Sequence, residues 1–160
     1  MIMEIIKNEE APPQQEQESV ANSTDHKPCV LLIDKDMKNR NLIKSDFEAL
    51  GCVVDFTDSE EAISMFVPGK YDLIGTDLKL FGTSGYALSR KFREMEKSTK
   101  THTPIIVFTT SKPEVVSVDC KEYEMDAIVS KPVKGGQAKQ IFEHYIQHKK
   151  ANLDGIKTLN

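Results

Sequence analysis

The sequence has few cysteines, no excess of positive charge and no long apolar run. Its three cysteines stand far apart in 160 residues, so neither a disulfide framework nor a metal-finger spacing is present. The formal net charge of −4 excludes the general basic surface of nucleic-acid-binding domains. No apolar stretch approaches the ~20 residues that cross a bilayer, and residues 1–7 are too short for a signal peptide. We therefore expect reduced cysteines in a cytoplasmic protein, with the nucleus as a second location.

The two ends of the chain differ in composition from its middle. Residues 8–28 are rich in Glu, Gln, Pro, Asn and Ser, and this composition predicts a disordered tail that includes the preceding residues, over 1–28 in all. Residues 29–149 carry the apolar patterning of one domain. Residues 150–160 are interpreted as a short polar tail. Because only about a dozen residues follow the last predicted helix, we expect no DNA-binding domain after it.

Five short apolar runs alternate with five stretches of helical spacing. The predicted strands are 29–33, 52–56, 71–77, 105–108 and 127–129, and the helices begin near 36, 58, 86, 111 and 136. Runs buried on both faces are typical of parallel sheets, and short right-handed crossovers place helices on both sides. The sequence therefore predicts an α/β fold with a doubly wound five-stranded parallel sheet and five helices.

Capping signals locate several of these helices. Asp36 stands where an N-cap is expected, and Gly51 where the first helix ends. Asp58 with Glu61, and Ser111 with Glu114, have the spacing of capping boxes. The helix after Ser111 is poor in strong helix formers and has no terminal glycine. The last helix is expected to run from about 136 to 149.

Four of the predicted strands end in a polar residue. These residues are Asp34, Asp77, Thr109 and Lys131. In a doubly wound sheet the carboxyl ends of the strands lie along one edge, where ligands bind. Asp77 alone could equally be the cap of the next helix. The convergence of two carboxylates, a hydroxyl and an ammonium instead favours a site.

These residue types suit phosphoryl chemistry. Two carboxylates can hold a hard cation, and one carboxylate can attack phosphorus to form an aspartyl phosphate. A lysine supplies a positive charge for a phosphoryl oxygen, and a threonine hydroxyl can hydrogen-bond to it. Adding this negative charge would provide a two-state switch.

The set resembles the receiver domain of two-component and phosphorelay response regulators over about residues 29–148. The matching segments are Val30 to Asp34, Asn39-Arg40, Tyr71 to Asp77, Gly85-Tyr86, Pro104 to Thr109 and Lys131-Pro132. The pair Asn39-Arg40 and the single-domain layout are similar to plant and other eukaryotic phosphorelay receivers, which suggests cytokinin signalling as one setting.

The resemblance implies a flavodoxin-like fold with strand order 2-1-3-4-5. It also implies Asp77 as the phosphoacceptor, Thr109 as the switch hydroxyl and Lys131 as the lysine on the phosphoryl group. A cis peptide is expected before Pro132. The implied partners are a histidine-containing phosphotransfer protein or a histidine kinase, with no membrane and no direct DNA contact. Such a domain is not an enzyme, beyond its own phosphorylation and dephosphorylation.

One departure from the family concerns the metal site. The resemblance implies magnesium on Asp34, Asp77 and a second acid after the first strand, where this chain has Lys35. Two unit charges 4 Å apart repel by about 4 kcal/mol at an effective dielectric constant of 20, and a divalent ion doubles this. We therefore expect weak or lost magnesium binding. Lys35 either bridges to Asp77 in place of the metal or extends into solvent.

Further departures lie around the same site. Thr110 is larger than the residue usual after the switch threonine, Lys79 adds a charge, and Ile128 replaces a frequent aromatic ring. His144 and His148 have the spacing of a metal pair, but a solvated helix end is the simpler interpretation.

Two hypotheses follow from these residues. The first is a phosphorelay receiver that accepts phosphate on Asp77. The alternative is a degenerate receiver that binds proteins without being phosphorylated.

Overall fold

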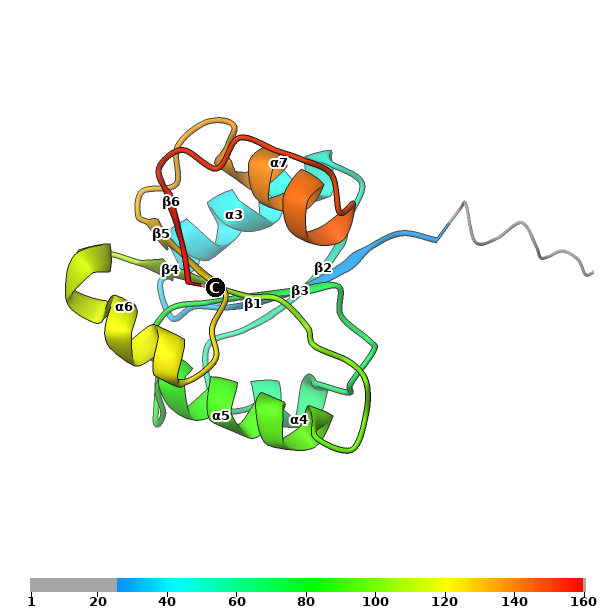
Figure 1. Ribbon diagram of the computed structural model, residues 1–160, viewed down its shortest axis with the longest axis vertical. Helices are drawn as coiled ribbons and strands as arrows, with labels where there is room; N and C mark the ends of the chain where they lie inside the picture. Colours follow the sequence, from blue (N-terminus) through cyan, green and yellow to red (C-terminus); the bar gives the residue numbers. More distant parts are fainter. Residues whose placement is uncertain (1–25, 160) are drawn as a thin grey trace, which may run out of the picture.

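The computed structural model describes residues 26–159 as a parallel sheet with helices on both faces (Figure 1). The strands are β1 Cys29–Ile33, β2 Val53–Thr57, β3 Leu73–Thr76, β4 Ile105–Thr109, β5 Ala127–Ser130 and β6 Ile156–Thr158. The helices are α3 Met37–Ala49, α4 Ala62–Met65, α5 Gly85–Glu96, α6 Pro113–Glu122, α7 Gln137–Ile141 and the continuing π-helical turn η3 Phe142–Ile146. Residues 1–25 of the predicted tail lie outside the described part of the chain, and residues 26–28 have no regular structure.

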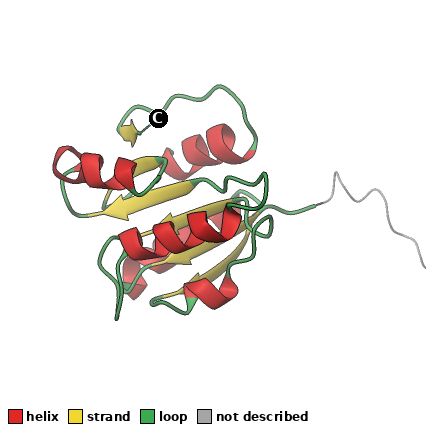
Figure 2. Cartoon of the chain, turned by 60° about the horizontal axis from the view of Figure 1, so that its bottom comes forward, coloured by secondary structure: helices red, strands yellow, loops and turns green. Residues whose placement is uncertain are grey.

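The sheet order is β2-β1-β3-β4-β5-β6, and the first five strands are parallel. The predicted order 2-1-3-4-5 and the doubly wound fold are therefore confirmed. The structure adds β6, which pairs antiparallel with β5 at the sheet edge (Figure 2). This strand comes from residues that the sequence indicated to be a polar tail.

Alternate side chains of each central strand pack into two separate cores. Leu31 and Ile33 of β1 face the core covered by α4, α5 and α6, whereas Val30 and Leu32 face the core covered by α3 and α7. Every residue of β3 and β4 is buried. Burial on both faces explains why these strands are continuous apolar runs rather than alternating ones.

Several helix ends follow the sequence signals. Asp36 caps α3, accepting from the backbone N–H groups of Lys38 and Asn39. Gly51 adopts φ +95°, the left-handed conformation that ends the helix. Glu124 adopts φ +60° just after α6, at the place where a glycine would fit more easily.

Both predicted capping boxes are wrong. α4 begins only after Glu61, and the hydroxyl of Ser59 accepts from the Glu61 N–H in a tight turn. The segment is therefore a turn followed by four helical residues, and the helix ends at Phe66, two residues before Pro68. At α6 the N-cap is Lys112, which forms no side-chain capping bond. The proline at its first position is as expected.

Residues 153–159 close the far edge of the sheet. Ile156 is buried among the residues facing α3 and α7, and Leu159 is buried in the other core. The Leu159 N–H donates to the carbonyl of Asp126, directly before β5. The segment therefore fastens β5 from both faces.

No helix among residues 26–159 is long and apolar enough to cross a membrane.

Candidate phosphoacceptor site

Lys131 joins the two strand-end carboxylates. Its Nζ lies 2.6 Å from Oδ2 of Asp34 and 2.6 Å from Oδ2 of Asp77. The Lys131 and Asp34 side chains are 3 % and 5 % exposed, whereas that of Asp77 is 16 % exposed. Asp34 is therefore the buried anchor, and Asp77 is the carboxylate that an incoming group can reach. The predicted convergence of these residues is what the structure shows.

Backbone groups fix both carboxylates. Oδ1 of Asp34 accepts from the N–H of Asp36 at 2.9 Å, and Oδ1 of Asp77 accepts from the N–H of Leu78 at 2.6 Å. Both bonds form because the chain turns directly after β1 and β3. Asp77 therefore caps the turn after its own strand with one oxygen while the other oxygen meets Lys131.

Gly85 allows α5 to begin next to Asp77. A Cβ atom at this position would clash with the backbone carbonyl of Asp77, and the Gly85 N–H donates to the carbonyl of Leu78 at 2.9 Å. A side chain here would displace either the helix or the loop that begins at Asp77. The sequence indicated Gly85 only as a loop marker and as part of the family resemblance; its steric role depends on the close approach of the Asp77 carbonyl, which only the fold reveals.

The third expected residue, Thr109, lies at the end of β4. Its side chain is buried, and its Oγ1 accepts from the N–H of Ser111 at 3.0 Å. Thr109 and Asp77 line the same cavity of about 200 Å³, together with Lys35, Asp36, Asn39, Leu78, Lys79, Thr110, Ser111 and Lys131. The peptide bond between Lys131 and Pro132 is cis, as the resemblance implied.

Burial and pairing act differently on the two partners of the Asp34–Lys131 ion pair. Burial raises the pKa of Asp34 above its ordinary value, although bonds from Lys131 and the Asp36 N–H act in the opposite direction. Burial lowers the pKa of Lys131, but the bonds from Asp34 and Asp77 outweigh burial and raise it overall. Lys131 therefore stays charged, and it is the constant positive group of the site.

Lys35 makes no ion pair with Asp77. The Lys35 side chain is exposed, and its Nζ lies 5.7 Å from the centre of the Phe81 ring. Among residues 26–159 no carboxylate forms a salt bridge with Lys35. Of the two positions expected for Lys35, the structure therefore shows the one in solvent and not the bridge to Asp77.

The described residues fit the magnesium ion of the resemblance poorly. Both oxygens of Asp36 accept hydrogen bonds from the first turn of α3, and Asp34 and Asp77 share Lys131. No group of three or more His, Cys, Asp or Glu side chains able to hold a metal occurs within residues 26–159. This also leaves His144 and His148 without a third ligand, and the His144 ring packs edge-on against Tyr145.

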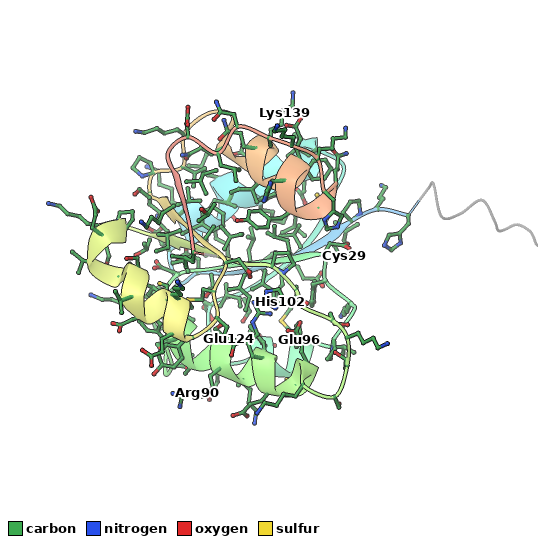
Figure 3. All side chains as sticks on the ribbon, in the orientation of Figure 1. Cys29, Arg90, Glu96, His102, Glu124 and Lys139 are labelled. Carbon is green, nitrogen blue, oxygen red and sulfur yellow. The ribbon has the colours of Figure 1, made fainter. Side chains whose placement is uncertain are left out.

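A larger groove of about 680 Å³ lies between α5 and α6, away from Asp77. Its buried floor is Arg93, whose five N–H donors all have acceptors: Glu96, Asp126 and the carbonyls of Thr103 and Glu124. Figure 3 shows Glu96, His102 and Glu124 gathered beside α5. Because these donors are already satisfied, this cluster fastens α5 to β5 rather than offering a free group to a ligand.

Comparisons with known proteins agree with this site. Residues 30–143 match the response regulator receiver domain model. The hybrid signal transduction histidine kinase L of Dictyostelium discoideum is 29 % identical over 121 residues, which are 72 % of this chain and 7 % of that protein. The transcriptional regulatory protein ResD of Bacillus subtilis is 32 % identical over 104 residues, 64 % of this chain and 41 % of ResD. The chain thus spans less than half of each relative.

Solved receiver structures have the same fold. The receiver domain of the Arabidopsis thaliana histidine kinase CKI1, complexed with Mg²⁺ and BeF₃⁻, matches 76 % of this chain and 91 % of that one, with a TM-score of 0.65 and 25 % identity. The Saccharomyces cerevisiae Ssk1 receiver, crystallised with the phosphotransfer protein Ypd1, matches 80 % and 94 %, with a TM-score of 0.70 and 19 % identity. The family match and the site geometry together establish that this chain belongs to the response regulator receiver domain family.

Proposed function

We propose that this chain is a phosphorelay receiver that accepts a phosphoryl group on Asp77. The observation that carries the proposal is the partly exposed carboxylate of Asp77, whose Oδ2 lies 2.6 Å from the ammonium of a buried lysine, in a cavity that Thr109 also lines. A carboxylate in this position can attack phosphorus in line while Lys131 receives the developing charge. The Thr109 hydroxyl would then donate a hydrogen bond to an oxygen of the new phosphoryl group.

The donor is a phosphohistidine on a phosphotransfer protein or a histidine kinase. Two large apolar side chains, Met37 and Phe81, are 63 % and 56 % exposed, and they belong to the segments that follow the acids of β1 and β3. They offer contact area to a docking protein at the place where its phosphohistidine must approach. Ssk1, which meets Ypd1 in its crystal, supports this class of partner. The domain carries no other catalytic role than its own phosphorylation and dephosphorylation.

Transfer from a phosphorylated histidine phosphotransfer protein tests this function. We expect phosphate to move to the wild-type chain and to Asp119→Asn, an exposed control on α6. Asp77→Ala should receive none, because the nucleophile is absent. Phosphate can be followed by intact mass and by phosphate-affinity gels. Equal transfer to Asp77→Ala would contradict the proposal.

A degenerate receiver is the second candidate, and one observation favours it. Lys35 stands where the family has a second acid, so the charges of Asp34, Asp77, Lys35 and Lys131 sum to zero. A chain of this kind would bind partners equally well with Asp77 or with Asp77→Ala, and it would never take up phosphate from any donor.

A further inference from the structure

The cavity around Asp77 is unusually rich in lysine. Lys35 and Lys79 line it together with Lys131, so three ammonium groups accompany the carboxylates of Asp34, Asp36 and Asp77. Lys35 follows β1 directly and Lys79 follows Asp77 by two residues, so both are carried by the short loops at the strand ends. The site therefore contains as many cations as anions before any ligand arrives.

All three carboxylates already contact protein groups, although Lys131 donates a hydrogen bond to Asp77 alone and Asp34 Oδ2 has only its ion pair with that lysine. Asp36 is used by the first turn of α3, and Asp34 and Asp77 both contact the Lys131 ammonium at 2.6 Å. A magnesium ion would compete with Lys131 for these oxygens and would be repelled by Lys35, and both effects weaken its binding. A phosphoryl group, in contrast, brings two negative charges to a place with three lysines.

Lys35 rests in a position that it can leave at little cost. Its only described partner is the Phe81 ring, 5.7 Å from Nζ. Both side chains are exposed, and an exposed cation–π contact contributes about 0.5–1 kcal/mol. An ion pair with a phosphoryl dianion inside a half-closed cavity is stronger than this. Lys35 can therefore move from Phe81 to the phosphoryl oxygens when they appear.

We propose that Lys35 replaces the divalent ion of this site, so that Asp77 accepts a phosphoryl group without magnesium. Lys35 is a phosphoryl-contacting residue in this scheme, and Phe81 holds it beside the cavity until the donor arrives. The inference rests on the proposed function, because it needs Asp77 to be the phosphoacceptor. It goes further by assigning the counter-charge to a side chain of the chain itself.

The transfer step balances with phosphoramidate as the small donor. An Asp77 carboxylate oxygen forms a bond to phosphorus while the P–N bond breaks. The bonding pair leaves with nitrogen, which already carries its protons and departs as neutral ammonia. The product is the acyl phosphate of Asp77 with a dianionic phosphoryl group, which Lys35 and Lys131 contact together.

The test measures the rate of phosphate uptake from phosphoramidate by intact mass, once with magnesium and once with a chelator. Four proteins are compared: wild type, Lys35→Gln, Lys35→Asp and Lys38→Gln. Lys38 is an exposed lysine on the same helix as Met37 and does not line the cavity, so its variant is the matched control. Circular dichroism and urea unfolding of each variant confirm that it is folded.

The proteins should differ in their rates of phosphate uptake when magnesium is removed by the chelator. Wild type and Lys38→Gln should react at nearly the same rate with and without magnesium. Lys35→Gln should lose about tenfold in chelator, equal to ~1.4 kcal/mol of transition-state stabilisation. Lys35→Asp restores the acid that the family has at this position. Its rate of phosphate uptake should therefore be about tenfold higher with magnesium than in chelator.

Each contrary result has a distinct meaning. Uptake by the wild type only with magnesium would overturn the role of Lys35 and leave the proposed function intact. Unchanged uptake by Lys35→Gln in chelator would do the same. No uptake from phosphoramidate by any of the proteins under either condition would overturn the role of Lys35, and the transfer from a phosphorylated phosphotransfer protein would then decide the proposed function separately.

Discussion

At the scale of single residues, the site depends on one lysine between two acids. The residue types at the four strand ends were sufficient to predict that Asp34, Asp77, Thr109 and Lys131 meet, because parallel strands bring their carboxyl ends together. The sequence could not predict that the Lys131 ammonium lies 2.6 Å from an oxygen of each acid. That arrangement depends on side-chain conformations inside a packed edge.

The central ion pairs make a stability prediction. Lys131→Met keeps the side-chain length but removes the charge, leaving Asp34 buried without its partner. We expect the free energy of unfolding at neutral pH to fall by about 3 kcal/mol, the usual cost of breaking a buried ion pair. Urea denaturation measures this, with the exposed Lys139→Met as control.

A second substitution tests the cause of this loss. Adding Asp34→Asn to Lys131→Met removes the unpaired buried charge, so part of the lost stability should return. A double variant that is no more stable than Lys131→Met alone would show that lost packing, and not the orphaned carboxylate, explains the effect.

The sequence alone could not decide whether Lys35 bridges to Asp77 or extends into solvent. Lysine has a long flexible stem, so its location is set by neighbours on other segments rather than by its own strand. The ring that it meets, Phe81, comes from the loop after Asp77. Only the folded chain brings these two side chains together.

At the scale of secondary structure, the sequence predicted the strands better than the helix starts. Buried strands were visible as continuous apolar runs because both faces are covered. Capping boxes were misleading at Asp58 and Ser111, since the same residue spacing also suits a turn. The strand Ile156–Thr158 was missed because three residues carry no periodicity, and its pairing with β5 is decided by tertiary contact.

The added strand gives a prediction at this scale. Ile156 is 7 % exposed and pairs with Val129 of β5, two residues before Lys131. Ile156→Asp should lower the free energy of unfolding by about 3 kcal/mol, because it removes apolar burial and places an unpaired charge in the core. Lys157→Asp, on the exposed neighbour, should change it by less than ~0.5 kcal/mol.

Amide exchange locates the effect of this strand. In Ile156→Asp the amides of Ala127–Ser130 should exchange faster, while those of the central strand β1 keep their protection. Faster exchange across the whole sheet would show that the substitution unfolds the domain, and unchanged exchange in β5 would show that the strand does not support it.

At the scale of the whole molecule, the fold places the site at one edge of a sheet that is covered on both faces. Two cores clamp β1, β3 and β4, whose ends present Asp34, Asp77 and Thr109, and β6 closes the far edge beside Lys131. In the proposed scheme, Lys35 on the loop after β1 supplies the counter-charge that a metal ion supplies in the family. Phosphorylation of Asp77 would then depend on groups that the chain itself provides.

The most direct test of this account is to find the phosphorylated residue. Borohydride reduces an acyl phosphate of aspartate to homoserine, and cleavage after lysine releases the peptide Tyr71–Lys79, which contains Asp72 and Asp77. After exposure to a phosphodonor, peptide sequencing by mass spectrometry should find homoserine at position 77 and unchanged aspartate at position 72. Homoserine at another aspartate, or none in a sample that has gained phosphate, would contradict the assignment of Asp77 as the phosphoacceptor.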